Sequence, residues 1–245
     1  MKLNIYPDFE SLTYAAVEMF VELANQSIRK RGRCSVALSG GGTPEPFYRA
    51  LAEPANQARI LWEQLHLFWG DERPVSPADP ESNFYMAREA LIGPVEIPQE
   101  NVHRVPAEMD VRLAAFSYEE TLRDFFEGEW PRFDLVLLGM GEDGHTASLF
   151  PESAGLNEEH RWFIANYAPK RETWRLTLTK HAINAGREIW VLVRGASKAD
   201  KLAEVLTGKQ APRANPIQLI RPADGELVWM VDQAAAQKLP EEIKH

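Results

Sequence analysis

The stretch DLVLLGMGEDGHTASLFP, residues 134–151, joins an apolar run to a glycine-rich segment that ends in a proline. The run DLVLL predicts a buried strand, and Gly139, Gly141 and Gly144 follow at the spacing of a dinucleotide-binding loop. A Rossmann fingerprint also needs its third glycine to open a helix of normal length. Here Pro151 follows only seven residues after Gly144. The pattern therefore disfavours a dinucleotide site and favours glycines that place His145 at the end of a strand.

Strand-like and helix-like segments alternate along the rest of the chain. Apolar runs predict strands over 34–39, 65–71, 133–140, 162–168, 174–179, 188–195 and 226–232. Helical periodicity covers 9–32, 44–53, 82–92, 110–128, 179–186, 198–208 and 233–239. This alternation predicts an α/β fold with a three-layer, Rossmann-like, mostly parallel sheet and helices on both faces. The strands around 162–179 lack a helix between them and are expected to pair antiparallel. With no repeat or linker-like stretch, residues 1–245 are expected to form a single domain.

Composition and charge narrow the classes of partner. The chain has 44% hydrophobic and 26% charged residues, which is ordinary for a globular protein. Its net charge of −9 disfavours a nucleic-acid partner or an anionic membrane surface. The start resembles no signal peptide and the apolar runs are too short to span a membrane, so a cytoplasmic location is expected. The single Cys34 is expected to be a core thiol.

Four loops after predicted strands are candidates for ligand binding, because ligands of open α/β sheets bind beyond the carboxyl ends of the strands. The first, SGGGTPEP, is interpreted as a phosphate cradle built by Ser39, Gly40, Gly41, Gly42 and Thr43, with the helix after it pointing its N–H groups back at the loop. No Gly-Lys-Ser/Thr follows, so a nucleoside triphosphate is not indicated. The alternative is a flexible turn that caps the helix.

The second and fourth loops supply charge. In WGDERP, Asp71 could hold sugar hydroxyls and Arg73 could clamp a phosphate or polarise a carbonyl. Lys170, Arg171 and Arg175 in APKRETWRLTLT supply positive charge, and Lys198 in a later loop adds another cation. With the glycine-rich loop and Arg73, they could form the local positive site that an anionic ligand of an acidic chain requires. The alternative for each of these residues is a solvated surface charge.

The third loop is the glycine-rich stretch, which brings Asp143 and His145 to the same edge. His145 can act as a base near neutral pH, whereas His66, His103, His160, His181 and His245 are interpreted as structural or surface residues. No Gly-x-Ser-x-Gly elbow or zinc-binding pattern occurs. A base that acts on water or on a substrate proton is the chemistry that remains, with no metal and no cofactor expected.

Three stretches, SGGGTPEPFYRAL, WGDERPVSPADPESNF and DLVLLGMGEDGHTASLFP, resemble the 6-phosphogluconolactonase family in the same order along the chain. The resemblance implies a fold related to the glucosamine-6-phosphate deaminases. It also implies hydrolysis of 6-phospho-D-glucono-1,5-lactone to 6-phospho-D-gluconate, in the oxidative pentose phosphate pathway, by a cofactor-free enzyme that is a monomer or a weak homo-oligomer.

The resemblance also assigns roles to the candidate residues. His145 would activate water and later protonate the departing ring oxygen, and Asp143 would either orient His145 or contact the substrate. The remaining candidates would hold the substrate, its phosphate or the developing oxyanion: Ser39, Gly40, Gly41, Gly42, Thr43, Asp71, Arg73, Lys170, Arg175 and Lys198. Arg171 and Glu172 stand where family members commonly carry a proline-rich KPP stretch.

Two other functions are open. An amino-sugar-phosphate deaminase or isomerase would carry a glutamate where this chain has Phe150 and a tyrosine where it has Arg73. A non-enzymatic sugar-phosphate sensor domain would follow a DNA-binding helix-turn-helix, for which the first predicted helix leaves no room. Both alternatives are disfavoured.

Overall fold

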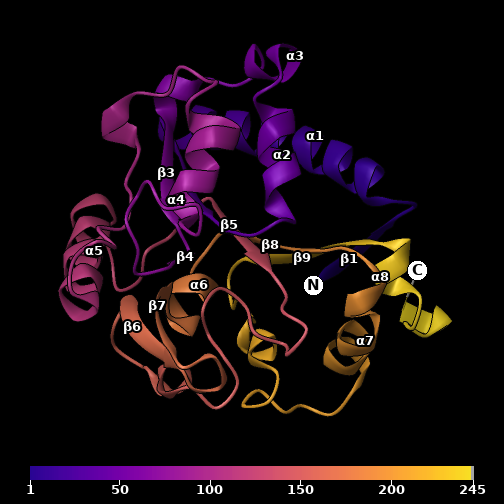
Figure 1. Ribbon diagram of the computed structural model, residues 1–245. Helices are drawn as coiled ribbons and strands as arrows, with labels where there is room; N and C mark the ends of the chain where they lie inside the picture. The colour runs from indigo at the N-terminus through magenta and orange to yellow at the C-terminus, as the bar shows by residue number, and fades with distance from the viewer. Residues whose placement is uncertain (244–245) are drawn as a thin grey trace.

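The computed structural model describes residues 1–243 and has a parallel sheet at its centre (Figure 1). This six-stranded sheet has the order β1-β9-β8-β5-β2-β3, and every neighbouring pair of strands is parallel. The buried strands are near-continuous apolar runs, as expected for a parallel sheet covered on both faces. Their bounds are β1 Lys2–Tyr6, β2 Cys34–Leu38, β3 Leu65–Trp69, β5 Leu135–Gly139, β8 Glu188–Val193 and β9 Glu226–Asp232.

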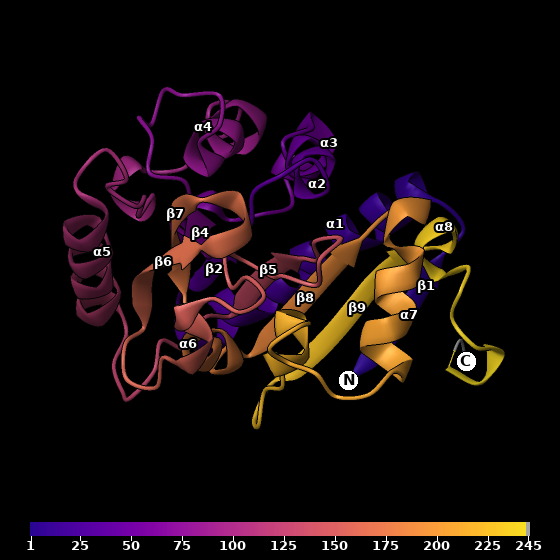
Figure 2. The ribbon, with the colours of Figure 1, turned by 60° about the horizontal axis from the view of Figure 1, so that its bottom comes forward.

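Helices cover both faces of this sheet. Figures 1 and 2 show α1 (Phe9–Arg31), α2 (Pro44–Leu51) and α3 (Pro54–Gln57) on one face. On the other face lie α6 (Lys180–Asn184) and α7 (Ala199–Thr207), while α8 (Gln233–Ala236) directly follows β9. The three-layer α/β prediction is confirmed.

A second, smaller sheet lies beside the first. It is antiparallel, with the order β4 (Asp71–Glu72), β7 (Thr173–Leu178) and β6 (Phe163–Ala168). Gly70 joins the sheets, because its N–H donates to the Leu38 carbonyl while its own carbonyl accepts from the Leu178 N–H, both at 2.8 Å. The remaining helices, α4 (Asn83–Ala87) and α5 (Val111–Phe125), lie on this side of the molecule (Figure 2).

The structure differs from the sequence prediction in four respects. The antiparallel pairing around 162–179 is confirmed, but these strands lie with β4 in a separate sheet. The single strand expected over 65–71 divides into β3 and β4 at Gly70. The helix expected over 82–92 is α-helical only to Ala87 and then makes a π-turn, in which Gly93 N–H donates to the Arg88 carbonyl at 2.8 Å. Strand β1 was not predicted, because this short edge strand depends on pairing with β9. The single-domain organisation of residues 1–245 stays a prediction.

The interior is apolar and contains the lone thiol. Cys34 is fully buried at the start of β2, and burial, with a smaller effect of the nearby Asp134 charge, raises the pKa of its thiol. A thiol with a raised pKa is a poor nucleophile, which agrees with its interpretation as a core residue. Among residues 1–243, no helix is long and apolar enough to cross a membrane.

Two histidines form a half-buried pair at the start of β3, away from the carboxyl edge of the sheet. His66 Nδ1 lies 3.2 Å from His103 Nε2, and the His103 ring stacks on Phe68 with ring centroids 4.3 Å apart. Burial, with a smaller effect of the His66 charge, lowers the pKa of His103 to about 4. Burial, with a smaller effect of the Arg33 charge, also lowers the pKa of His66. The fold therefore holds this pair in the neutral form.

We predict that the protein loses stability as the pH falls from about 6.5 toward about 4. In this window the unfolded chain binds more protons than the folded one, so acid favours unfolding. Urea denaturation at stepped pH measures the effect. The His103→Phe variant keeps an aromatic ring at this position but cannot titrate, so its free energy of unfolding should decline less steeply. Equal slopes for both proteins would contradict the explanation.

Candidate active site

The carboxyl ends of three parallel strands and the start of the small sheet surround a cleft of about 220 Å³. The loop after β2 contributes the glycine-rich segment, β4 and the turn after it contribute Asp71 and Arg73, and the loops after β5 and β8 contribute His145 and Lys198. The cleft thus collects residues from three of the four loops selected from the sequence. Its lining residues are Ser39, Gly40, Gly41, Gly42, Thr43, Pro44, Asp71, Arg73, Asn83, Gly139, Met140, Gly141, His145, Ala147 and Lys198.

His145 and Asp143 form a hydrogen-bonded pair at this cleft. His145 Nδ1 contacts Asp143 Oδ1, and the same oxygen accepts the His145 backbone N–H at 3.2 Å. Burial alone would raise the pKa of Asp143, but the hydrogen bonds from His145, its charge and the Arg171 charge together bring it well below the usual range. Because an ionised carboxylate only accepts hydrogen bonds, Nδ1 carries the proton and Nε2 keeps a lone pair for acid–base chemistry.

Gly141 is the residue that makes room for this pair. A Cβ at Gly141 would lie 2.0 Å from His145 Nδ1 and 2.6 Å from Asp143 Oδ1, distances that no side chain tolerates. The Gly141 N–H donates to the His145 carbonyl at 2.9 Å, which closes the loop. Gly144 adopts a φ of +79°, where L side chains are strained. The glycines therefore place His145, as predicted from the sequence.

Asn83 completes the glycine-rich wall of the cleft and was not predicted from the sequence. Its Nδ2 donates to the Asp71 carbonyl at 2.8 Å, which fixes the orientation of the amide. Its Oδ1 is buried without a hydrogen-bond partner among the described residues and packs over Gly40, where a Cβ would lie 1.7 Å away. Asn83 stands in the ESNF stretch well after the charged turn, so no local pattern marks it.

A buried carboxylate positions Arg73. Glu72, which is 1% exposed, accepts the backbone N–H groups of Arg73 and Asn83 at 2.7 Å and that of Phe84 at 2.8 Å, and the Ser82 hydroxyl at 3.0 Å. Burial raises the pKa of Glu72, while the backbone hydrogen bonds oppose that change. This network ties β4 to the start of α4 and holds the turn from which Arg73 enters the cleft.

Lys198 reaches the cleft from the loop after β8. Both carboxylate oxygens of Asp232, at the end of β9, accept the Gly195 N–H at 3.0 Å and anchor this loop. Lys198 Nζ lies 3.9 Å from Oε1 of Glu142, in the loop that carries His145, and Lys198 lines the cleft. A cation is therefore held on the β8 side of the site, while Arg73 lies on the β4 side.

The fourth predicted loop lies at the rim and not in the lining. Arg175, on β7, is half-buried and interacts electrostatically with Arg73 and Asp71. Lys170 is exposed and does not line the cleft. Its neighbour Arg171, predicted from the sequence as one of the positive charges of this loop but given no role in the site, stacks on Phe150 with its guanidinium carbon 5.1 Å from the ring centroid.

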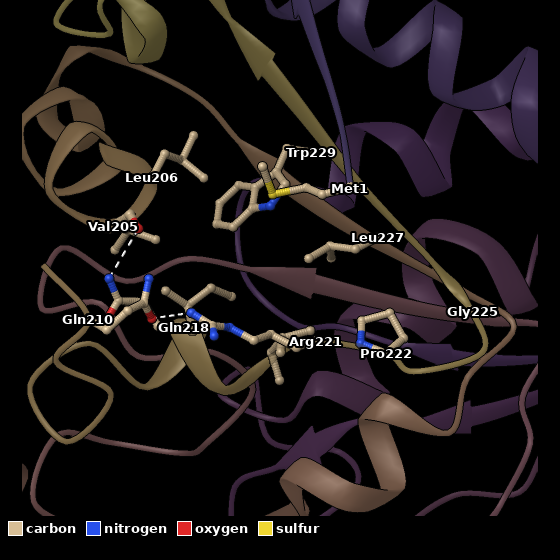
Figure 3. Close-up of a pocket in the computed structure, with 12 residues that line it drawn as sticks. Met1, Val205, Leu206, Gln210, Gln218, Arg221, Pro222, Gly225, Leu227 and Trp229 are labelled. Carbon is tan, nitrogen blue, oxygen red and sulfur yellow. Dashed lines mark hydrogen bonds between the residues drawn. The ribbon is translucent and has the colours of Figure 1, made fainter. Parts of the chain in front are cut away.

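A second cavity, of about 390 Å³, opens between α7 and the amino-terminal part of β9 (Figure 3). Trp229, Leu227, Leu206 and Val205 form its apolar walls, and Arg221 donates to Gln210 at its edge. This cavity is larger than the cleft at the carboxyl edge, but none of the described residues that line it is a histidine or a carboxylate. It therefore lacks the acid–base groups of the cleft at the carboxyl edge.

The other histidines lie outside the cleft. His66 and His103 form the neutral pair described above, His181 contacts Glu159 at 2.8 Å, and His160 is exposed. His245 lies outside the described residues. Within residues 1–243, no group of three or more histidine, cysteine, aspartate or glutamate side chains is arranged to hold a metal ion.

The fold and the cleft together define an α/β protein whose carboxyl sheet edge brings together a hydrogen-bonded histidine–aspartate pair, a glycine-rich loop and two cations. Residues 7–229 match the family described as Glucosamine-6-phosphate isomerases/6-phosphogluconolactonase. The chain therefore belongs to this family, and the resemblance stated from the sequence is confirmed.

Individual relatives agree with this assignment. The 6-phosphogluconolactonase of Synechocystis sp. is 44% identical over 218 residues, which cover 87% of this chain and 88% of the relative. The solved 6-phosphogluconolactonase of Trypanosoma cruzi is 30% identical with a TM-score of 0.86, covering 97% of this chain and 96% of its own. A monomeric glucosamine-6-phosphate deaminase shares the fold at 20% identity, with a TM-score of 0.80 over 97% of this chain and all of its own.

We predict that Gly141→Ala displaces the His145 ring from Asp143, because the new methyl group would overlap both side chains. Proton NMR at low temperature should show a downfield imidazole N–H resonance for the hydrogen-bonded pair in the wild type and lose it in the variant. Gly70→Ala is the matched control, since a Cβ there meets only the Leu38 carbonyl at 3.4 Å. An unchanged resonance in Gly141→Ala would contradict the role given to this glycine.

Proposed function

We propose that this protein hydrolyses 6-phospho-D-glucono-1,5-lactone to 6-phospho-D-gluconate. The observation that carries the proposal is the His145–Asp143 pair at a cleft that also holds a glycine-rich loop, Arg73 and Lys198. The relatives named 6-phosphogluconolactonase support the same reaction. The site is suited to it because lactone hydrolysis needs a base for water, a stabiliser for an oxyanion and a binding site for a phosphate.

His145 supplies the acid–base chemistry in this proposal. Its Nε2 takes a proton from water, and the hydroxide attacks the lactone carbonyl to form a tetrahedral oxyanion. When the bond between the carbonyl carbon and the ring oxygen breaks, the imidazolium returns the proton to that oxygen. Asp143 keeps Nδ1 protonated and stabilises the imidazolium, so it acts through His145. General acid–base catalysis of this kind contributes about 10²- to 10⁴-fold.

The cations and the glycine-rich loop bind the anionic parts of the substrate. Lys198 lines the cleft and lies 3.9 Å from Glu142 Oε1, in the loop that carries His145, so we assign it to the oxyanion that develops near the base. Arg73 enters from the other side, and we assign it and the backbone of residues 39–43 to the phosphate. Asp71, which accepts the Ser148 hydroxyl at 2.7 Å, faces the cleft and can accept a sugar hydroxyl.

The deaminase or isomerase alternative lacks its expected side chains. Phe150 occupies the position expected for a glutamate, and its ring packs against His145 with centroids 4.6 Å apart. An apolar ring cannot exchange protons with a substrate, so the contact serves to hold the histidine. The arginine at position 73 likewise replaces a tyrosine. Water is therefore the better partner for His145.

The first test is lactonase activity itself. We expect the purified protein to accelerate hydrolysis of 6-phospho-D-glucono-1,5-lactone above its spontaneous rate, measured as acid release in a pH-stat. A progress curve that matches buffer alone at high protein concentration would rule out the proposed function.

The second test addresses the base. His145→Ala should lower kcat by about 10²- to 10⁴-fold because the proton acceptor is lost. Asp143→Asn should lower kcat by a smaller factor, since the imidazole remains but loses its charged partner. Stopped-flow kinetics at neutral pH measure both effects, and circular dichroism confirms folding. His160→Ala removes an exposed histidine and should keep the wild-type rate; full activity in His145→Ala would refute the assignment.

A further inference from the structure

Three arginines gather at one rim of the cleft without a carboxylate partner. Arg73 donates to the Glu81 backbone carbonyl, and Arg175 Nη1 donates to the Thr173 hydroxyl at 3.0 Å and the Trp174 carbonyl at 2.9 Å. Arg171 stacks on Phe150. Within residues 1–243, no carboxylate oxygen lies within 4.0 Å of a side-chain nitrogen of these three arginines.

Arg73 and Arg171 both lie close enough to Arg175 for their charges to act on it. Burial, together with the charges of Arg73 and Arg171, lowers the pKa of Arg175, although Asp71 and Glu81 act in the opposite direction. A group of like charges of this kind is unfavourable in the free protein. An anion bound among them relieves the repulsion and gains charge-assisted hydrogen bonds.

Arg171 is also linked to the base by a stack of side chains. Its guanidinium carbon lies 5.1 Å from the Phe150 ring centroid, and that ring lies 4.6 Å from the His145 ring. Arg171 further contributes to the low pKa of Asp143, which places its charge near the mouth of the cleft. The turn between β6 and β7 presents it there, since Pro169–Arg171 form a short helix and Glu172 follows with a φ of +49°.

We infer that Arg171 is a third binding residue for the phosphate of the substrate, alongside Arg73 and Arg175, held in place by Phe150. The inference rests on the proposed lactonase function. The phosphate is the better ligand than the oxyanion because Arg171 contacts Phe150 and not His145, whereas the oxyanion forms beside the base. Position 171 lies where the family commonly carries proline, so this contact would be an addition in this chain.

Arg171→Ala tests the inference through binding and kinetics. We expect the Kd for 6-phospho-D-gluconate, measured by titration calorimetry, and the KM for the phosphorylated lactone to rise about five- to ten-fold. The value of kcat should stay close to that of the wild type, because Arg171 does not touch the reacting atoms. Arg171→Lys keeps the charge and should recover part of the affinity.

Arg33→Ala provides the matched control. Arg33 is also exposed and stacks on a phenylalanine, with its guanidinium carbon 4.0 Å from the Phe125 ring centroid, but it precedes β2 at the opposite end of the sheet. Its removal should leave Kd, KM and kcat unchanged.

The outcomes separate this inference from the proposed function. An active wild type whose Arg171→Ala variant binds 6-phospho-D-gluconate as tightly as before would overturn the inference alone. A variant with unchanged Kd but reduced kcat would also overturn it, and would show that Arg171 acts on His145 through Phe150. A wild type without lactonase activity would instead refute the proposed function.

Discussion

The contact between the His145 imidazole and the Asp143 carboxylate is the interaction on which the site depends. It forms within a turn of five residues whose first member, Gly141, has no side chain to obstruct it. Strand β5 is central in the sheet and buried, so the turn starts from a rigid point. Phe150 packs on the ring and limits its movement. The orientation of the base thus follows from local backbone geometry mounted on the core.

Buried carboxylates serve as anchors for the loops that carry the cations. Glu72 collects hydrogen bonds from the segment that leads from Arg73 into α4, and Asp232 holds the loop that leads to Lys198. In both cases the carboxylate accepts hydrogen bonds from backbone N–H groups and does not form an ion pair with the cation whose loop it holds. Arg73 therefore stays available to an anion, which an acidic chain requires if it is to bind a phosphorylated substrate.

Much of the fold was predictable because its strands are buried on both faces and read as apolar runs. Strand β1 and the split at Gly70 were not, since each depends on a partner far along the chain: β9 for the first, β7 for the second. In the site, the glycines, His145, Arg73 and Lys198 were recognisable from their place after predicted strands. Asn83 was not recognisable, because it reaches the cleft only when the start of α4 packs against β4, where its amide donates to the Asp71 carbonyl.

The sequence by itself determined the class of fold, the edge of the sheet at which the cleft lies and the histidine placed there, because periodicity and strand ends are local properties. Only the tertiary structure decided which charges meet. Lys170 and Arg171 are neighbours in sequence, chemically alike and both exposed, yet the turn between β6 and β7 places the Arg171 guanidinium against Phe150. This contact depends on a side chain from the loop after β5, distant in sequence, and no local pattern records it.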